Sequence, residues 1–336
     1  MNGQTGTGLI DGFGRVHRDL RISLTDKCSL RCTYCMPESG VPWLAKQSLL
    51  SPAEIERVVR VAAAEGIETV RLTGGEPLIS PNLIEIVRRI TAIEGKSGPI
   101  EVSMTTNGIR LPEFLPGLEE AGLTRLNISI DTLDPDRFRE LTRRDRLIDV
   151  LAGIEAARRS ALRPLKLNAV VMRGVNDDEV VDLVEFAIKH DAQMRFIEHM
   201  PLDIGHTWDR GEMVPREEIL ASLRQSFNLE PVPGRGGAPA ELFSIDGGPA
   251  TVGVIASVSA PFCANCDRLR LTADGQLRNC LFARDELDLL SALRNGASDQ
   301  AVRDIFLAGV SGKRAGHGID DPGFIQPDRG MNAIGG

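Results

Sequence analysis

Short apolar segments rich in β-branched residues alternate with helix-like stretches between residues 20 and 200. The segments are Leu20–Thr25, Thr69–Thr73, Ile100–Thr105, Leu126–Ile130, Leu165–Met172 and Met194–Ile197. This alternation predicts an α/β fold of parallel strands joined by right-handed helical crossovers. Six units are too few for the usual eight-stranded barrel, so we expect an incomplete, TIM-like (βα)6 barrel.

The starts of several helices are marked in the sequence. Ser51-Pro52-Ala53-Glu54 combines a Ser N-cap, Pro at the first helical position and Glu at the third. One apolar helical face follows, made of Ile55, Val58, Val59 and Ala62. Further helices are expected to open at Ser80-Pro81, at Asp134-Pro135 and over residues 177–188.

The pattern changes after Met200-Pro201, which predicts a barrel over residues 1–200 and an extension over 201–336. Pro231–Pro239 is rich in Pro and Gly and is expected to form a loop. A strand is expected over Ala250–Val258, and a hairpin turning at Ala273-Asp274-Gly275 joins the predicted strands Leu269–Thr272 and Gln276–Leu281. For Asp274 and Gly275 we expect turn chemistry only.

All six cysteines fall into two groups of three. Cys28, Cys32 and Cys35 have the spacing Cys-x3-Cys-x2-Cys, and Cys263, Cys266 and Cys280 the spacing Cys-x2-Cys-x13-Cys. A closed zinc or iron–sulfur site takes four protein ligands, so each trio is one ligand short. We interpret the trios as two [4Fe–4S] sites, each with one iron open to a ligand that is not protein. The predicted hairpin would return Cys280 to Cys266.

Composition limits the function classes. The net charge of −8 argues against general binding of nucleic acid or membrane surfaces. No apolar run is long enough to span a membrane, and residues 1–20 lack the apolar core of a signal peptide, so we expect a cytoplasmic protein. In a reducing compartment, grouped cysteines more often bind metal than form disulfides. An alternative for the first trio is a zinc site completed by a distant histidine.

A glycine motif follows the second predicted strand. Thr73-Gly74-Gly75-Glu76-Pro77, taken with Cys-x3-Cys-x2-Cys upstream, resembles the paired motifs of the radical S-adenosylmethionine (SAM) enzymes. The second trio, with Asp267-Arg268-Leu269-Arg270 between its members, resembles the GTP 3′,8-cyclases of molybdenum cofactor biosynthesis within that superfamily. The resemblance extends through Thr105–Gly108, Asn127–Asp131, Lys166–Asn168, Arg195–Pro201 and the terminal Gly-Gly.

Several arginines carry a signal of their own. Arg268 and Arg270 alternate on a predicted strand beside an open cluster, so both side chains point the same way. Paired guanidiniums are suited to binding phosphate. Arg21 and Arg71 each border the mouth of a strand and are expected to join them, whereas Lys166 alone is a weaker candidate.

The resemblance assigns roles that the residues alone do not. It implies that SAM contacts Tyr34, Gly75, Ser129 and Met200. It implies that GTP contacts Arg21, Arg71, Thr105, Lys166, Arg268, Leu269 and Arg270. It also implies that a flexible tail ending in Gly335 and Gly336 reaches into the active site and serves catalysis.

The implied reaction begins with one-electron cleavage of SAM at the first cluster. The resulting 5′-deoxyadenosyl radical removes hydrogen from C3′ of GTP, and C3′ then adds to C8 of guanine, which the second cluster helps to position. The product, (8S)-3′,8-cyclo-7,8-dihydroguanosine 5′-triphosphate, is the first intermediate on the way to molybdopterin. Implied partners are an electron donor of flavodoxin or ferredoxin type, a downstream pterin synthase and a second copy of the chain.

Two alternatives remain at this stage. One is a peptide-modifying radical SAM enzyme, although such enzymes usually carry more C-terminal cysteines than the three found here. The other is an iron–sulfur electron carrier, which leaves the glycine motif and the clustered arginines unexplained.

Overall fold

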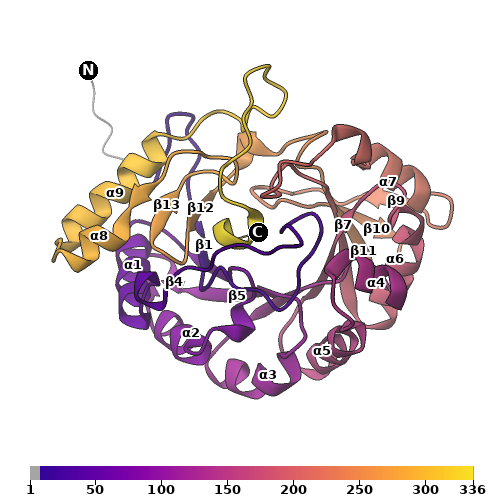
Figure 1. Cartoon of the computed structure of the whole chain (residues 1–336), viewed down its shortest axis with the longest axis horizontal. Helices are drawn as coiled ribbons and strands as arrows, with labels where there is room; N and C mark the ends of the chain where they lie inside the picture. The colour runs from indigo at the N-terminus through magenta and orange to yellow at the C-terminus, as the bar shows by residue number, and fades with distance from the viewer. Residues whose placement is uncertain (1–7, 336) are drawn as a thin grey trace.

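The computed structural model describes residues 8–335 and has one large sheet wrapped by helices (Figure 1). Its centre is a run of parallel strands. They are β1 (Asp19–Ser23), β2 (Thr69–Thr73), β5 (Glu101–Thr106), β6 (Arg125–Ser129), β7 (Leu165–Val171) and β8 (Ala192–Glu198). All six predicted strands are confirmed within two residues at each end.

Six helices follow these strands and cover the outside of the sheet. They are α1 (Pro52–Ala64), α2 (Leu83–Thr91), α3 (Leu111–Glu120), α4 (Pro135–Thr142), α5 (Leu147–Arg159) and α6 (Val180–Lys189). Ser51 and Glu54 form the predicted capping box of α1, and Asp134 caps α4 through the N–H of Arg137. Both predicted starts are therefore confirmed.

Two predicted helix starts are displaced. Ser80-Pro81 does not open α2, because Pro77–Ile79 forms a 3-10 turn and the N–H of Ser80 closes it. Asn82 is the N-cap instead. Residues 177–179 likewise form a 3-10 turn before α6 begins at Val180.

The region after residue 200 extends the same sheet at both edges. Strand β11 (Thr251–Ile255) pairs in parallel with β8, and β12 (Arg268–Leu271) pairs in parallel with β1. The open sheet has the order β14-β13-β12-β1-β2-β5-β6-β7-β8-β11-β10-β9. The chain between β11 and β12 therefore passes from one end of the parallel run to the other.

The remaining helices and strands lie outside the central parallel run. They are the hairpin β3 (Glu94–Gly95) and β4 (Gly98–Pro99), and then α7 (Arg216–Leu223), β9 (Leu229–Pro231), β10 (Glu241–Ile245), β13 (Gln276–Arg278), β14 (Leu287–Asp288), α8 (Leu289–Arg294), α9 (Asp299–Ser311) and α10 (Met331–Ile334). β12 and β13 form the predicted antiparallel hairpin, and residues 232–239 form the predicted loop.

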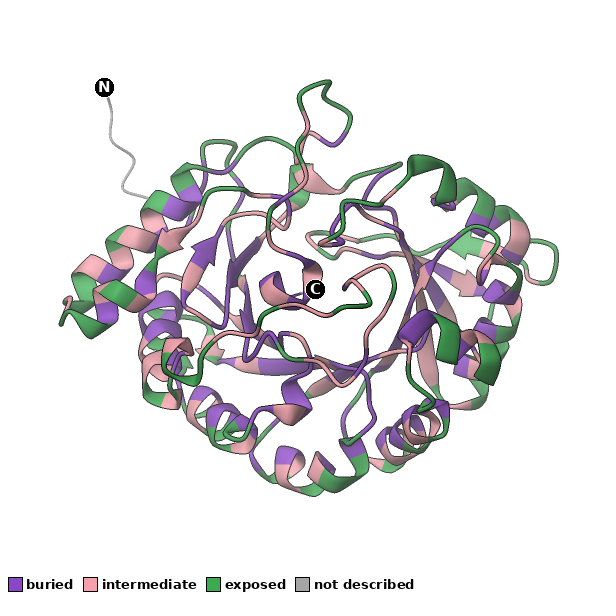
Figure 2. Ribbon diagram, in the orientation of Figure 1, coloured by how far each residue is buried: buried purple, intermediate pink, exposed green. Residues whose placement is uncertain are grey.

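The hydrophobic core lies between the sheet and the inner helix faces (Figure 2). The predicted face of α1, made of Ile55, Val58, Val59 and Ala62, is buried there. In the described part of the chain, no helix has both the length and the apolar character needed to cross a membrane. α10 lies inside the ring of strands, so the end of the chain reaches the centre of the molecule.

Candidate functional site: a cavity inside the sheet and two cysteine trios

The first trio lies in the loop after β1. Cys28, Cys32 and Cys35 all line a cavity enclosed by the parallel strands. The N–H groups of Cys35 and Met36 donate to the carbonyl of Cys32 at 3.0 Å, which folds the loop into a tight turn. Burial raises the pKa of Cys28 to about 11 and that of Cys35 to about 12, so free thiols there are protonated at neutral pH.

The paired glycines allow this loop to pack against β2. A Cβ on Gly74 would lie 2.4 Å from the carbonyl oxygen of Thr25, and one on Gly75 would lie 2.1 Å from that of Lys27. Glycine is therefore required here for the approach of two backbones. The N–H of Gly75 donates to the Thr25 carbonyl at 2.7 Å, and Gly75 also lines the cavity.

Two buried carboxylates stand near the first trio. Glu76 accepts hydrogen bonds from Thr106 Oγ1 and the Asn107 N–H, both at 2.7 Å, and burial raises its pKa to about 7. Asp131 accepts a hydrogen bond from the hydroxyl of Tyr34 at 2.7 Å, and burial raises its pKa to about 6. These groups fix the ends of neighbouring strands around the cavity.

Three arginines form a row across adjacent strands. Arg270 on β12 is in register with Arg21 on β1, and Arg21 is in register with Arg71 on β2. All three line the cavity. Burial, followed by the charges of Arg71 and Arg270, lowers the pKa of Arg21. Because like charges in register repel, this row favours an anionic ligand.

Arg268 extends the positive surface by one step along β12. It lies on the same face as Arg270, as the alternation predicts, and its guanidinium lies 4.5 Å from the ring centre of Phe262. The buried Nε atoms of Arg21 and Arg268 have no hydrogen-bond partner in the described residues. Buried donors without partners favour a ligand that accepts hydrogen bonds.

Most of the sequence-predicted residues meet in this cavity. In addition to the first trio and the four arginines, Tyr34, Gly75, Thr105, Ser129 and Met200 line it. Lys166 shares the β7 face of the lining residues Asn168 and Val170 but lies further from the carboxyl end of the strand. Leu269 is buried with its side chain in the core, so a ligand would meet its backbone.

Sequence reasoning gave no role to two polar residues of the cavity. Arg195 on β8 lines the cavity, and burial together with the charge of Arg71 lowers its pKa to about 10. Asn168 on β7 is in register with Arg195, and its Oδ1 has no hydrogen-bond partner among residues 8–335. An arginine within the last predicted barrel strand was the available signal.

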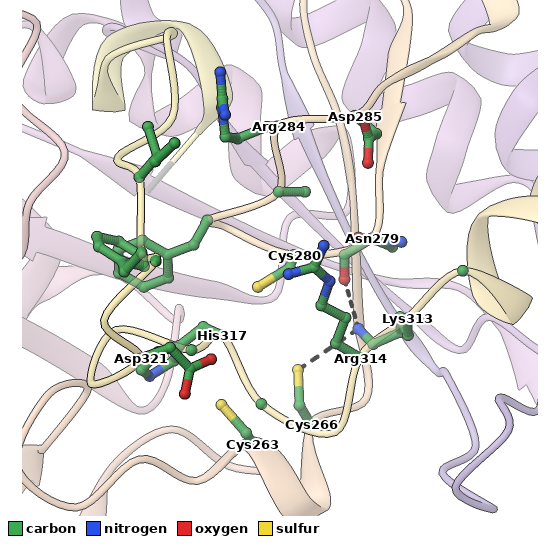
Figure 3. A pocket seen from close by; sticks show the side chains of 18 of the residues that line it. Cys263, Cys266, Asn279, Cys280, Arg284, Asp285, Lys313, Arg314, His317 and Asp321 are labelled. Atoms are coloured by element: carbon green, nitrogen blue, oxygen red, sulfur yellow. Dashed lines mark hydrogen bonds between the residues drawn. The ribbon is translucent and has the colours of Figure 1, made fainter.

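The second trio lies in a separate pocket beside β12 and β13 (Figure 3). Cys263 and Cys266 flank the 3-10 turn Cys263–Asn265, and Cys280 follows β13. The hairpin therefore brings Cys280 back to the other two, as predicted. Phe262 and Leu281, the chain neighbours of Cys263 and Cys280, line the cavity of the first trio, so the two sites adjoin.

The donor sets fit iron–sulfur clusters. Each trio offers three free thiols from one compact region, all partly accessible. In the described residues, no three His, Cys, Asp or Glu side chains converge as ligands of a single metal ion. A four-iron cluster instead takes thiolates at separate corners, so its ligands need not converge on one point.

The C-terminal tail enters the cavity of the first trio. Met331 and Asn332 line it, Asn332 Nδ2 donates to the Asp26 carbonyl at 3.1 Å, and Arg270 donates to the Gly335 carbonyl. Gly335 has φ +72°, and a Cβ on it would lie 2.6 Å from Ser23 Oγ. Gly336 lies outside the described residues.

The tail is anchored by Arg329. Its guanidinium makes a bidentate contact with Asp274, at 3.0 and 2.9 Å, and its Nε lies 2.9 Å from Glu286. The expectation that Asp274 serves turn chemistry only is therefore wrong, because its carboxylate also holds the tail. Thr272 Oγ1 donates to the same carboxylate at 2.6 Å, so the turn function is also present.

Comparisons with known proteins agree with this architecture. Residues 22–187 match the radical SAM superfamily, and residues 192–319 match the family model Molybdenum Cofactor Synthesis C. The solved structure of Streptococcus suis SuiB with its precursor peptide SuiA has a TM-score of 0.61 at 15% identity, covering 90% of this chain and 69% of SuiB. At that identity the likeness shows the fold alone.

Curated relatives match over nearly the whole chain. A GTP 3′,8-cyclase of Streptomyces coelicolor is 56% identical over 331 residues, covering 98% of this chain and 96% of the relative. One of Corynebacterium glutamicum is 51% identical, covering 98% and 89%. With these relatives, and with a radical SAM region followed by a molybdenum cofactor synthesis region, the chain belongs to the GTP 3′,8-cyclases, radical SAM enzymes of the first step of molybdenum cofactor biosynthesis.

Proposed function

We propose the following roles for the residues of this cyclase. Cys28, Cys32 and Cys35 hold the [4Fe–4S] cluster that binds SAM, and Cys263, Cys266 and Cys280 hold a second cluster facing GTP. When bound and reduced, the first cluster and SAM supply the radical chemistry. Residues 1–200 form the SAM-binding barrel, and residues 201–336 supply the second cluster and the closing tail.

The observation that carries the substrate assignment is the in-register row Arg270–Arg21–Arg71. A triphosphate bound along this row would neutralise three buried guanidiniums and give hydrogen-bond acceptors to the Nε atoms of Arg21 and Arg268, which lie at ion-pair distance from Asp19 and Asp267 but make no hydrogen bond in the described residues. We assign Lys166, Arg195 and Thr105 to the same ligand from neighbouring strands. The backbone of Leu269 completes the contact.

SAM is assigned to the part of the same cavity next to the first trio. Tyr34, Gly75, Ser129 and Met200 line the cavity together with the three cysteines. The hydrogen bond from Tyr34 to Asp131 fixes the ring beside the cluster loop. Gly335 approaches the cavity from the C-terminal side, and we assign to it and to Gly336 the exclusion of water that radical chemistry requires.

A substitution tests the arginine row. Arg71→Met should raise the KM for GTP by about 10- to 100-fold because it removes a charged hydrogen-bonding group from a buried anion site. Arg60→Met is the matched control, since Arg60 is exposed on α1. An unchanged KM in the Arg71 variant would remove the triphosphate from this row.

The overall assignment is tested by anaerobic reconstitution with iron and sulfide, followed by SAM and dithionite. Formation of 5′-deoxyadenosine should rise strongly with GTP and not with ATP. Formation that ignores the nucleotide would remove the GTP assignment from this cavity. No formation by a protein loaded with both clusters would favour an electron carrier.

Three further partners belong to the proposal. They are a one-electron donor of flavodoxin or ferredoxin type, a downstream pterin synthase that takes the product, and a second copy of the chain in a cytoplasmic homodimer. Sedimentation of the reconstituted protein tests the dimer, and replacing dithionite with a reduced flavodoxin tests the donor.

A further inference from the structure

A buried lysine connects the segments that carry the second trio. Lys313 follows α9, and its Nζ donates to the carbonyl oxygens of Arg268 and Asn279, both at 2.7 Å. Arg268 opens β12 just after Cys266, and Asn279 precedes Cys280. One ammonium group therefore fixes the backbone beside two of the three cysteines.

The same ammonium reaches a sulfur atom. Lys313 Nζ donates to Sγ of Cys266 at 3.8 Å, within range for a hydrogen bond to sulfur (Figure 3). Lys313 is only 8% exposed, so solvent screens this charge weakly. It is the only lysine of the pocket lining.

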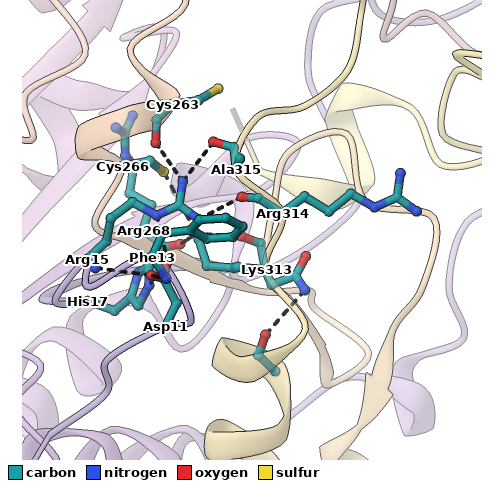
Figure 4. A network of polar contacts seen from close by, with 12 residues as sticks. Asp11, Phe13, Arg15, His17, Cys263, Cys266, Arg268, Lys313, Arg314 and Ala315 are labelled. Carbon is teal, nitrogen blue, oxygen red and sulfur yellow. Dashed lines mark hydrogen bonds and ion pairs between the residues drawn. The ribbon is translucent and has the colours of Figure 1, made fainter. Parts of the chain in front are cut away.

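Arg15 holds the other side of the trio through the backbone alone. Its Nη1 donates to the carbonyls of Cys263 at 2.7 Å and Ala315 at 3.0 Å, and its Nη2 donates to that of Arg314 at 2.6 Å (Figure 4). Asp11 orients the guanidinium through Nε at 2.6 Å. Arg15 thus positions Cys263 without a hydrogen bond to sulfur. A variant of Arg15 can therefore be compared with variants of Lys313, which does reach a sulfur.

Hydrogen bonds to the sulfurs and nearby charge set the reduction potential of an iron–sulfur cluster. Reduction of [4Fe–4S]²⁺ to [4Fe–4S]⁺ adds one electron and no proton, so a positive charge at the sulfur favours the reduced state. The first trio has different surroundings, because the carboxylates Glu76 and Asp131 stand beside it together with Arg31. The two clusters should therefore differ in potential through their protein environments.

We propose that Lys313 positions the second trio and, by donating to Sγ of Cys266, raises the reduction potential of the cluster held there. The inference rests on the proposed function, since it requires a cluster at Cys263, Cys266 and Cys280. It assigns Lys313 a positioning and tuning role, without contact to SAM or GTP.

The experiment is an anaerobic redox titration of the whole reconstituted protein with dithionite, followed by electron paramagnetic resonance, with iron analysis in parallel. A protein in which Cys28, Cys32 and Cys35 are all replaced by Ala identifies the signal of the second cluster. Lys313→Met should lower the potential of that signal and leave the first cluster unchanged. Lys313→Arg, which keeps the charge, should have a potential close to that of the wild-type protein.

Arg15→Gln separates positioning from charge. It should reduce the iron retained at the second site, while the potential of any cluster that remains shifts less than in Lys313→Met, because Arg15 makes no hydrogen bond to sulfur. Lys189→Met, at an exposed position on α6, is the matched control and should change neither quantity.

The outcomes are distinguishable. A fully loaded Lys313→Met protein with an unchanged second potential overturns the inference, and so does an equal shift in Lys313→Arg. If Lys313→Met loses the second cluster, selective loss of about four of about eight irons, restored in Lys313→Arg, supports it. Loss of both clusters would indicate a general folding defect and overturn the specific role. Wild-type protein that binds only about four irons would instead overturn the proposed function.

Discussion

The two cysteine trios line adjoining cavities and differ in the charged groups around them. The first trio is partly accessible and stands near the carboxylates Glu76 and Asp131 and the cation Arg31, and burial raises the pKa of each of its thiols. The second trio is surrounded by buried cations. Although burial alone would raise the pKa of Cys266, Arg268 and Lys313 lower it below the ordinary value.

This difference indicates that the two sites are built for different ligands. The carboxylates beside the first trio suit SAM, which brings its own sulfonium and ammonium charges. The arginine row lies on other strands of the same cavity and suits a nucleotide with several negative charges. Lys313 and Arg15 hold the backbone of the second trio, and the arginine row is where we propose that the triphosphate binds.

The largest expected effect separates the two trios. Cys28→Ala should abolish 5′-deoxyadenosine formation with any nucleotide, because SAM loses its cluster. Cys280→Ala should keep a slow, nucleotide-independent cleavage of SAM and lose cyclised product. Chromatographic measurement of both products on the same reconstituted samples checks the pair. Cyclisation that survives in Cys280→Ala would break the assignment of GTP to the second site.

A smaller but still large effect is expected at the tail, which touches both sites. Gly335→Ala would place a Cβ 2.6 Å from Ser23 Oγ and 2.7 Å from Thr73 Cγ2, at a φ of +72°. The displaced tail should lower cyclisation by about 100-fold, the typical cost of a 1 Å misplacement. Iron content should not change. Gly248→Ala is the control, since Gly248 is exposed with ordinary contacts, and equal losses in the two variants would contradict the role of the tail.

Much of the barrel could be predicted from the sequence because its signals are local. The apolar segments gave β1, β2 and β5–β8, and Ser51 and Asp134 marked two helix starts through their caps. The parallel pairing of β11 with β8 and of β12 with β1 could not be predicted, since it joins residues far apart in sequence. That pairing places the second trio against the barrel instead of in a separate layer.

The same distinction holds within the site. The cysteine trios and the side-by-side placement of Arg268 and Arg270 followed from spacing alone. The row Arg270–Arg21–Arg71 depends on the register of three strands, which sequence spacing does not specify. Arg15, Lys313 and Arg329 had no visible role because each acts on backbone or side chains brought together only by folding.

A moderate effect is expected where the tail is tied to the hairpin of the second trio. Arg329→Gln and Asp274→Asn should each lower cyclisation by about 5- to 10-fold, because a partly buried charged pair contributes on the order of 1–2 kcal/mol. The double variant should cost little more than either single one if both act through the same contact. Steady-state rates of the four proteins give the coupling, and fully additive losses would show independent roles.

The smallest expected effect is the uptake of a fraction of a proton by Lys166 when GTP binds. This uptake tests how far the influence of the cationic residues extends across the sheet. Burial and the charge of Arg195 lower the pKa of Lys166 to about 7, so most of its population is neutral at pH 8. A triphosphate nearby favours the charged form, so GTP binding should take up protons at pH 8 and fewer at pH 6.

In the absence of nucleotide, the unfolded chain binds more protons at Lys166 than the folded chain does between the lowered pKa and the ordinary value. This group should therefore destabilise the fold most below pH 7 and progressively less as the pH rises.

Calorimetry of GTP binding in two buffers of different ionisation enthalpy measures that uptake directly. In Lys166→Met the uptake at pH 8 should fall by most of its amount, whereas Lys189→Met should keep it. Uptake that persists in Lys166→Met would assign the proton to another group of the site. The influence of the cationic residues would then end at the arginine row. The difference between the surroundings of the two trios would be confined to the residues next to them.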